Sequence, residues 1–225
     1  MSKLPSDFFL AQIERVISQE VKKMKFDLEH EAEIDTDWLT VKNYEFKLLV
    51  MIACLAENHL AFRGKLKDMC EFLGVSNQAN NTKKIQEAIT ALKDKGDIII
   101  LKEGYTWTLT LSNKASRKDK VKRIKNAYIS AIKAYEPADS DDSVDWENIL
   151  KVLVYLCADK REVKRYDEIA KALGLSEKTT KRAVKALVNI EFNDLSVKKK
   201  LAWFRNNDGD FKVIGNKYEV GYSFT

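Results

Sequence analysis

The sequence contains few of the residues that interrupt regular structure. Its 225 residues include only 8 Gly and 2 Pro, which leaves little room for low-complexity or unstructured chain. Charged residues make up 32% of the chain and hydrophobic residues 45%, the balance of a folded protein. The length suits one large domain or two small ones, so we expect an ordered, helix-rich protein.

Signals for a membrane or for export are also missing. The longest apolar run, Leu48 to Ala56, is far shorter than the roughly 20 residues that a membrane-spanning helix needs. The N-terminus has no basic region followed by an apolar stretch and a cleavage site. We therefore expect a cytoplasmic protein that makes no membrane contact.

Motifs for metal, redox or catalytic chemistry are scarce. Cys54, Cys70 and Cys157 form no C-x-x-C pair and lie in apolar helical patterns, so they are predicted to be buried thiols. His30 and His59 have no Cys or His at ligand spacing, and phosphate-binding glycine motifs do not occur. The carboxylates are scattered among lysines. We expect no enzyme, no metal and no cofactor.

Charge is distributed unevenly along the chain. Residues 1–37 contain five Lys and Arg against nine Asp and Glu, whereas residues 114–136 contain eight against two. Residues 137–145 are acidic, and residues 146–225 contain sixteen basic against eleven acidic side chains. This pattern indicates a polyanionic partner for the middle and the C-terminal half. For any single segment, a solvated Lys/Arg face is the alternative.

The first 30 residues have the spacing of an amphipathic helix. Its apolar positions recur every three or four residues at Leu10, Ile13, Ile17, Val21, Met24 and Leu28. Such a seam must be covered, either by the helix's own domain or by a second copy, so a homodimer is one of two alternatives. The acidic run from Glu29 to Asp37 is predicted to be a solvated connection.

An internal repeat organises the rest of the chain. Residues 66–76 align without gaps with residues 166–176, one hundred positions later. Each copy follows an apolar helix, predicted at 46–56 and at 149–158, and precedes an amphipathic helix and β-like sequence. The matched apolar pairs are Leu66 with Tyr166, Met69 with Ile169, Leu73 with Leu173, and Val75 with Leu175.

The β-like sequence of each copy predicts hairpins. In the first copy, residues 97–111 contain an alternating apolar pattern after a turn at Gly104. In the second copy, strands are predicted at 201–205, 211–214 and 217–224, with an Asn-Asn-Asp-Gly turn between the first two.

A helix, a short turn with Leu-Gly-Val/Leu-Ser, and a second helix are typical of the helix-turn-helix. Gly74 and Gly174 are expected to supply the positive φ of the turn, and Ser76 and Ser176 to cap the next helix. With the hairpin as a wing, both copies resemble the winged helix-turn-helix family.

We therefore predict an α+β fold, mainly α with small β-hairpins, in four parts. The N-terminal amphipathic helix and acidic connection occupy residues 1–37. Two winged-helix domains occupy 38–113 and 144–225, and a basic linker helix with an acidic loop joins them at 114–143. The predicted partner is double-stranded DNA.

The second copy carries the stronger candidate for a DNA-reading helix. Ala183, Val184 and Leu187 are expected to face inward, which leaves a basic outer face where phosphates and guanine edges would lie. The candidate DNA-binding residues are Lys178, Lys181, Arg182 and Lys185 on this helix, with Lys198, Lys199 and Lys200 ahead of the strand. The alternative is a solubilising, lysine-rich helix.

The first copy has amides where the second has cations. Asn and Gln side chains pair bidentately with adenine in the major groove, so this helix is a candidate for base reading. The candidate residues are Asn77, Gln78, Asn80, Asn81, Lys83 and Lys84. Alternatively these amides cap and extend the helix, and the first copy serves in protein contacts, including a homodimer.

Between the copies, the sequence from Ser116 to Asn126 is predicted to begin a helix with many basic residues in its first two turns. Its apolar stripe is Val121, Ile124, Tyr128, Ile132 and Tyr135. The candidate phosphate contacts are Arg117, Lys118, Lys122 and Arg123. A plain amphipathic connector is the alternative.

The sequence from Trp38 to Leu49 resembles the Leu-Thr-x-x-Glu-x-x-Leu-Leu opening of plasmid and phage replication initiators with tandem winged helices, although the spacing before Glu45 differs. The resemblance implies that the first domain mediates dimerisation and backbone contacts while the second reads repeated origin sites. A transcriptional regulator and a winged-helix interaction module without DNA binding are the alternatives.

Overall fold

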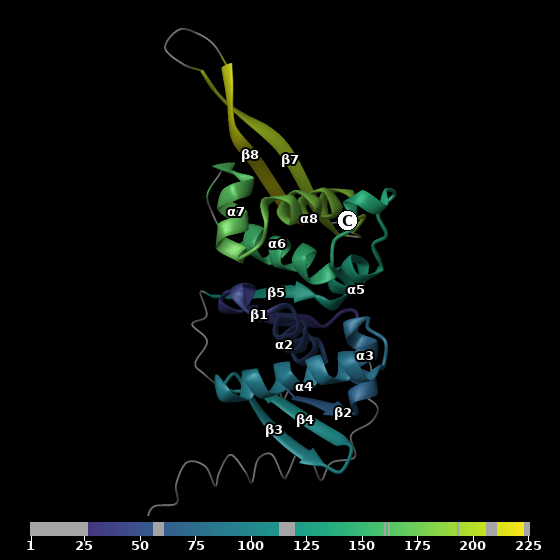
Figure 1. The fold of residues 1–225 in the computed structure, drawn as a ribbon. Coiled ribbons are helices and arrows are strands. Elements are labelled where there is room, and N and C mark those ends of the chain that lie inside the picture. Colours follow the sequence, from purple (N-terminus) through teal and green to yellow (C-terminus); the bar gives the residue numbers. More distant parts are fainter. Residues whose placement is uncertain are drawn as a thin grey trace, which may run out of the picture.

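The computed structural model describes residues 27–55, 61–112, 120–159, 161, 163–192, 194–205 and 211–222. These residues form an α+β fold of helices with small antiparallel sheets (Figure 1). Most of the predicted N-terminal helix lies outside them. Its last apolar position, Leu28, is not helical but lies in a turn with 49% of its surface exposed.

The first half of the chain forms a unit of three helices and a three-stranded sheet with the strand order β2-β4-β3. Its elements are α2 (Asn43–Leu55), β2 (Ala61–Gly64), α3 (Leu66–Leu73), α4 (Ala79–Asp94), β3 (Ile98–Glu103) and β4 (Thr106–Leu111). A short 3-10 helix, η1 (Thr36–Thr40), precedes α2.

The second half repeats this element order and this sheet topology, with the strand order β6-β8-β7. Its elements are α6 (Trp146–Ala158), β6 (Val163–Lys164), α7 (Tyr166–Leu173), α8 (Glu177–Asn189), β7 (Leu195–Arg205) and β8 (Phe211–Tyr222). The bounds of α3 and α7 differ by one hundred residues, so the repeat seen in the sequence is a repeat of structure.

The two turns confirm the predicted role of their glycines. Gly74 has a φ of 70° and Gly174 a φ of 64°, and each ends its helix in the left-handed conformation. Ser176 caps α8 as predicted, because its Oγ accepts a hydrogen bond from the Thr179 backbone N–H at 3.0 Å. The prediction for Ser76 was wrong: α4 begins only after Gln78, whose side chain makes no capping hydrogen bond.

The connection between the units differs from the prediction. β1 (Glu31–Asp35) pairs antiparallel with β5 (Val121–Lys125), so neither the solvated acidic run nor a helix starting near Ser116 is correct. Ala32 and Ile34 are fully buried on one face of β1. The cross-strand partners of Glu31 and Glu33 on β1 are Lys125 and Arg123, whose positive charges balance the strand's outer face. The helix α5 (Asn126–Ala134) begins only after this strand.

Both units share one hydrophobic core. The β1–β5 pair lies between α2 and α6 (Figure 1), and polar contacts cross the same boundary. The Trp146 Nε1–H donates to the Leu73 carbonyl at 3.4 Å, and the Lys151 ammonium donates to the Val41 carbonyl at 2.9 Å. The units are therefore packed together and not merely tethered. The 3-10 helix η2 (Ser140–Asp142) precedes α6.

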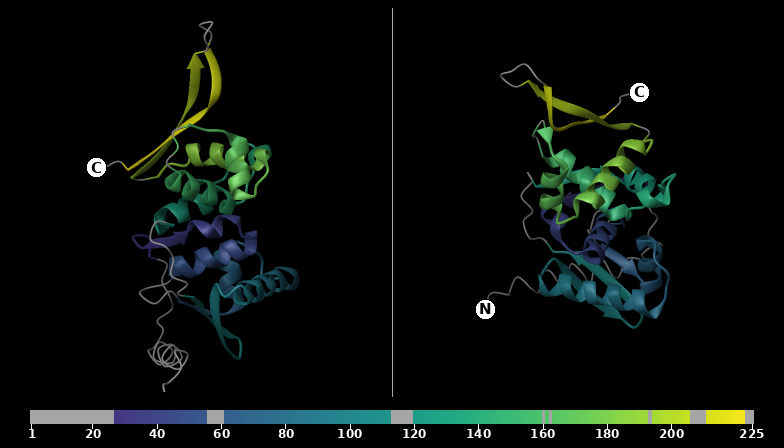
Figure 2. Two further views of the ribbon diagram at one scale, coloured as in Figure 1. Left: turned by 90° about the vertical axis from the view of Figure 1, so that its left-hand side faces the viewer. Right: turned by 45° about the horizontal axis from the view of Figure 1, so that its top comes forward.

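The two terminal hairpins differ in length. β3 and β4 turn tightly at Gly104, which has the expected positive φ of 57°. β7 and β8 pair along eleven positions, with a register shift between Ala202 and Trp203, and project beyond the helices (Figures 1 and 2). The strands predicted at 211–214 and 217–224 are thus parts of one strand, β8. The predicted turn at 206–209 lies outside the described residues.

Cys54 and Cys70 are buried as predicted, and Cys157 is partly buried. Burial raises the pKa of all three thiols, to about 11 for Cys157. Within the part of the chain that the structure describes, no helix combines the length and apolarity that a bilayer crossing requires.

Candidate nucleic-acid interface

The helix α8 separates an apolar from a basic face, as its sequence predicts. Its inward side chains, Thr180, Ala183, Val184, Ala186 and Leu187, are all buried. Lys178, Lys181 and Lys185 are exposed, and Arg182 is half-buried. The basic groups of this short helix therefore lie at the surface of the molecule.

Tyr166 joins two groups of cations that are separate in the sequence. The Lys181 ammonium on α8 lies 5.7 Å from the centroid of the Tyr166 ring, and the Lys199 ammonium on β7 lies 5.8 Å from it. Lys199 also donates to the Tyr166 hydroxyl at 3.1 Å. We call Tyr166, Lys181 and Lys199 the Tyr166 cluster; it connects the start of α7 with α8 and the long hairpin.

Sequence reasoning missed Tyr166 because its position matched an apolar one, Leu66, in the first copy. The signal that could have found it is the hydroxyl on an otherwise apolar position. A partly buried tyrosine ring can hold cations from two neighbouring elements. Leu66 has neither a π face nor a hydroxyl.

Several of these cations also have carboxylate neighbours. Lys181 pairs with Glu177 at 2.6 Å, Lys200 pairs with Glu219 at 3.0 Å, and Lys185 pairs with Asp142. Hydrogen bonds to Glu177 and Asp142 raise the pKa of Lys181 and Lys185 above the ordinary lysine value, so both remain charged. Because these pairs are largely solvent-exposed, each contributes little to stability, and an incoming phosphate can replace the carboxylate.

Other predicted cations make no such ion pair, although Glu219 is the cross-strand partner of Lys198. Among the residues that the structure describes, no carboxylate pairs with Lys178, Arg182 or Lys198. Lys198 and Lys200 lie on one face of β7 and Lys199 on the other, because side chains alternate along a strand. The hairpin thus directs cations both toward α7 and away from it.

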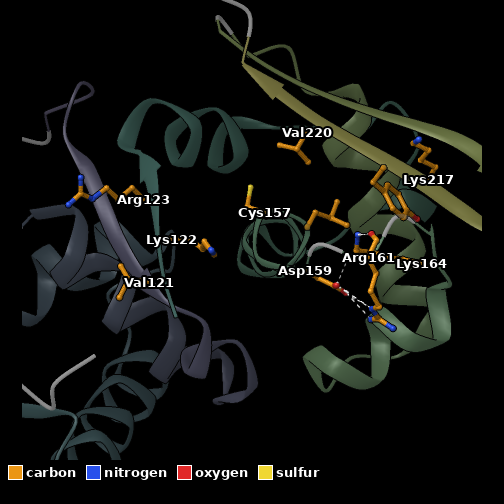
Figure 3. A pocket seen from close by; sticks show the side chains of 11 residues that line it. Val121, Lys122, Arg123, Cys157, Asp159, Arg161, Lys164, Lys217 and Val220 are labelled. Atoms are coloured by element: carbon orange, nitrogen blue, oxygen red, sulfur yellow. Dashed lines mark hydrogen bonds and ion pairs between the residues drawn. The ribbon is translucent and has the colours of Figure 1, made fainter. Parts of the chain in front are cut away.

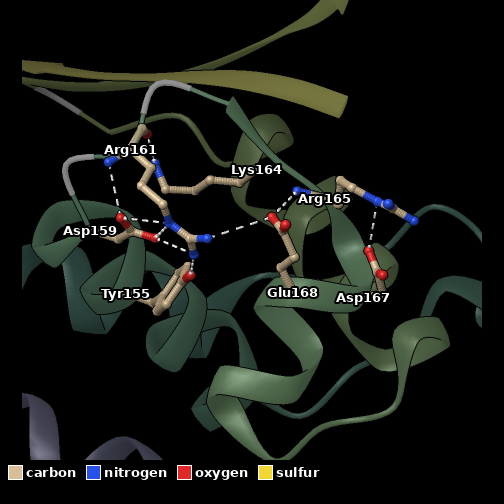
Figure 4. Close-up of polar contacts among 7 residues, drawn as sticks. All are labelled: Tyr155, Asp159, Arg161, Lys164, Arg165, Asp167 and Glu168. Carbon is tan, nitrogen blue, oxygen red and sulfur yellow. Dashed lines mark hydrogen bonds and ion pairs between the residues drawn. The ribbon is translucent and has the colours of Figure 1, made fainter. Parts of the chain in front are cut away.

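The loop ahead of α7 is fixed by arginine contacts (Figure 4). The Arg161 guanidinium donates to Asp159 at 2.8 Å and to the Tyr155 hydroxyl at 2.6 Å, and lies 3.8 Å from Glu168. Burial acts to raise the pKa of Asp159, but its hydrogen bonds with Arg161 and Tyr155 hold that pKa well below the usual range. These contacts join the end of α6 to Glu168 in the first turn of α7.

The corresponding surface of the first unit is organised differently. Asn81 donates to the carbonyl and the hydroxyl of Ser76, both at 3.0 Å, and Asn77 accepts a contact from the Cys70 thiol at 3.9 Å. Gln78 and Asn80 are exposed. Two of the four candidate amides therefore serve the local turn, which was the alternative interpretation of this segment.

The cations of the first unit do not form a comparable cluster. Lys83 lies 3.9 Å from Glu87, and Lys84 lies 6.0 Å from the Tyr44 ring centroid. On the hairpin, Lys102 packs on Trp107 at 4.6 Å from the ring centroid. The position on α3 that matches Tyr166 is Leu66, which offers Lys102 neither a ring nor a hydroxyl.

The candidates between the units fall in two places. Arg117 and Lys118 lie outside the described residues. Lys122 and Arg123 lie on β5, where Arg123 pairs with Glu33 at 3.2 Å and Lys122 lines a cavity beside α6 and β8. Neither belongs to the Tyr166 cluster.

The initiator-like segment has a structural role in this fold. Phe46, Leu48 and Leu49 are fully buried, and the nearly buried Glu45 accepts a hydrogen bond from Lys95 at 2.5 Å. These residues build the core of the first unit. No protein-family model matches the chain, and comparison with curated proteins finds no relative.

Proposed function

We propose that this chain binds double-stranded DNA through tandem winged helix-turn-helix units, at residues 38–113 and 144–225. The order of helices and strands, the glycine turns between the second and third helices, and the terminal hairpins support this interpretation. In the second unit, α8 is the recognition helix and the β7–β8 hairpin is the wing.

The observation that carries the proposal is the Tyr166 cluster. A major groove about 12 Å wide admits a helix, and the phosphates at its edges accept hydrogen bonds from lysine. The cluster holds one cation of α8 and one of the wing on a common aromatic support. If α8 lay in the major groove and the hairpin lay against the adjacent DNA backbone, this arrangement would bring both cations to the DNA.

The second unit is the proposed reader, and the first unit is proposed to mediate protein contacts, including a homodimer. This division is supported by the local use of Asn77 and Asn81 in the first unit. It agrees with what the resemblance to plasmid and phage initiators implies, so we propose initiation of replication as the biological role. Iterated direct repeats beside the gene would support that role, whereas an inverted repeat at a promoter would favour a transcriptional regulator.

The first prediction concerns the salt dependence of DNA binding. Replacing Lys181 and Lys199 together with alanine should weaken binding of a duplex taken from the gene's own flanking region. If both lysines contact phosphate, the slope of log affinity against log salt should fall by about two. Fluorescence anisotropy between about 50 and 200 mM salt measures this slope.

The matched control is the double variant Lys67→Ala with Lys93→Ala, which removes the same charge from exposed positions on α3 and α4. It should leave the slope within error of the native chain. An equal loss in both double variants would mean that net charge alone governs binding, and an unchanged slope in the Lys181/Lys199 variant would exclude the proposed interface.

A further inference from the structure

The connection between α5 and α6 lies against the proposed recognition helix. Residues 137–145, which we call the acidic loop, contain four aspartates and no lysine or arginine, and they include η2. The Asp142 carboxylate forms an ion pair with the Lys185 ammonium of α8, which is 43 residues away in the sequence. Figure 1 shows this connection passing beside α8. An acidic segment therefore contacts the helix that is proposed to meet the phosphates of DNA.

The backbone of the acidic loop holds Asp142 in place. The Asp139 carboxylate accepts a hydrogen bond from the Asp141 backbone N–H at 3.0 Å, and the Asp139 carbonyl accepts one from the Asp142 N–H at 3.1 Å. The loop leads into α6, and α6 packs against α8. Only 28% of the Asp142 side chain is exposed. An ordered backbone thus carries this carboxylate to Lys185.

Lys185 lies one helical turn from the Tyr166 cluster. Lys181 and Lys185 are four residues apart, so they share a face of α8, and about 6 Å of helix separates their backbones. This separation is shorter than the Debye length of about 8 Å at physiological ionic strength. A DNA backbone that reaches Lys181 would therefore also meet the negative charge beside Lys185.

The acidic loop already acts on Lys185 as a counter-ion. The pKa of Lys185 lies above the ordinary lysine value, first because of the hydrogen bond to Asp142 and then because of the negative charge of the same carboxylate. Asp139 and Tyr135 act in the same direction, whereas burial acts to lower the pKa. The loop thus stabilises the charged ammonium, as a phosphate at this position would.

The first unit also has a 3-10 helix ahead of its first long helix, but it uses its aspartate differently. η1 precedes α2 as η2 precedes α6. Asp37 of η1 pairs with Lys120, next to the start of β5, at 2.8 Å. The same element thus directs an aspartate to the strand pair in the first unit and to the proposed recognition helix in the second.

We propose that the acidic loop is an intramolecular competitor of DNA, in which Asp142 pairs with Lys185 until a phosphate replaces it. This inference rests on the proposed DNA-binding function. The pair is largely open to solvent on the Lys185 side, so its contribution is modest. The loop therefore lowers the affinity for a duplex without preventing binding, and the charge of its other aspartates adds to this effect.

The first test measures the contact without DNA. The full chain is acetylated with an N-hydroxysuccinimide ester, and mass spectrometry gives the reaction rate of each lysine. Only the neutral amine reacts, so pairing with a carboxylate slows the reaction. Asp142→Asn should raise the rate at Lys185 by about two- to fivefold. The rates at Lys93 and at Lys122, which lines a cavity beside β5 (Figure 3), should not change. An unchanged rate at Lys185 would overturn the proposal.

The second test measures duplex affinity by fluorescence anisotropy at about 100 mM salt. Asp142→Asn keeps the shape of the side chain and should raise the affinity by about two- to fivefold. The control Asp94→Asn removes the same charge from an exposed position on α4 and should leave the affinity unchanged. An equal gain in both variants would mean that net charge alone sets the affinity, which would reject the competition.

Lys185→Ala completes a double-mutant cycle. In this background, Asp142→Asn should raise the affinity by less than about twofold, because there is no ammonium left to release. The full gain in this background would assign the effect to repulsion and reject the pairing with Lys185. If Asp142→Asn fails to fold by thermal melting, Asp139→Asn replaces it, since the charge of Asp139 also acts on Lys185; it should give a smaller gain, and no gain would reject the proposal.

The two tests separate failure of this inference from failure of the proposed function. If the native chain binds a duplex and Asp142→Asn does not bind it more tightly, the competitor is rejected and the DNA interface is unaffected. If Asp142→Asn makes Lys185 more reactive but no variant binds a duplex, the DNA-binding function is rejected and the competition with it.

Discussion

At the scale of single residues, the difference between the two units depends on Tyr166. The same position in the first unit holds Leu66, which contributes only apolar surface to the core. Tyr166 keeps this apolar contact and adds a ring face and a hydroxyl, both of which contact lysines. One side chain thus serves the packing of α7 and the position of two surface cations.

Replacing Tyr166 with leucine, the residue of the first unit, should therefore weaken duplex binding more than it weakens folding. Loss of the ring and the hydroxyl removes interactions of about 0.5–1.5 kcal/mol each. Tyr166→Phe should lose only the part of the duplex affinity that depends on the hydroxyl, which is the smaller loss. Anisotropy gives the affinity and thermal melting the stability. Equal affinities for Tyr166→Leu and the native chain would show that the cluster does not organise the interface.

Gly174 allows a prediction about the turn. An added Cβ would meet no atom within 4 Å, so space does not limit substitution; the positive φ does. Gly174→Val should reduce the free energy of unfolding by about 1–2 kcal/mol or more, since a β-branched residue is poorly suited to this conformation. Gly174→Asn should cost less, because asparagine adopts it more readily. Thermal melting distinguishes the two, and identical losses would contradict the backbone explanation.

At the scale of elements, the sequence predicts the repeated part of the fold better than its centre. The helices α3 and α7 were recognisable because Leu73 and Leu173 are each followed by a glycine at the same offset. β1 and β5 were missed because their apolar residues are few. Ile124 fits a helical stripe with Tyr128 as well as it fits a strand, and only the pairing with β1, more than eighty residues away, decides between them.

The candidate site was also predictable from the sequence only in part. The basic face of α8 was predictable, because buried Ala183, Val184 and Leu187 determine which side chains remain outside. The Tyr166 cluster was not, because it requires β7 to return over the start of α7. The hydrogen bonds from Asn81 to Ser76 were likewise not predictable, because they depend on local geometry that residue type alone does not determine.

Asn126 provides a prediction for the junction of β5 and α5. Its buried amide donates to the Asp27 carbonyl at 2.8 Å and to the Cys54 carbonyl at 2.9 Å. Asn126→Ala should lower the free energy of unfolding by about 1–3 kcal/mol, because two carbonyls lose their donor. Chemical denaturation measures this loss. The exposed Asn80→Ala serves as a control and should change stability by less than about 0.5 kcal/mol.

At the scale of the whole molecule, the buried ion pair between the units matters most. The Lys47 ammonium lies 3.1 Å from the Glu147 carboxylate, with 9% and 0% of the two side chains exposed. Removing one partner should be costly, by about 3–5 kcal/mol, because the other charge stays buried. Replacing both, as Lys47→Met with Glu147→Leu, should cost much less. A double-mutant cycle by chemical denaturation tests this, and additive losses would contradict it.

The same pair gives a pH dependence with a definite sign. Burial raises the pKa of Glu147, although Lys47 acts to lower it. The folded state therefore binds this proton more tightly than the unfolded state does. Glu147 should therefore contribute more stability as the pH falls from neutral through its raised pKa. Glu147→Gln should remove this dependence of stability on pH in the range above the ordinary pKa of a glutamate side chain.

The shared core also constrains the spacing at which the proposed DNA-binding helices would contact a duplex. Because β1, β5 and α6 join the units in one packed body, α8 has a fixed position relative to the first unit. Two chains joined through their first units would then present their α8 helices at a set spacing and a set rotational angle around the duplex. Inserting about five base pairs, half of a helical turn, between two bound sites would place the second site on the opposite side of the DNA.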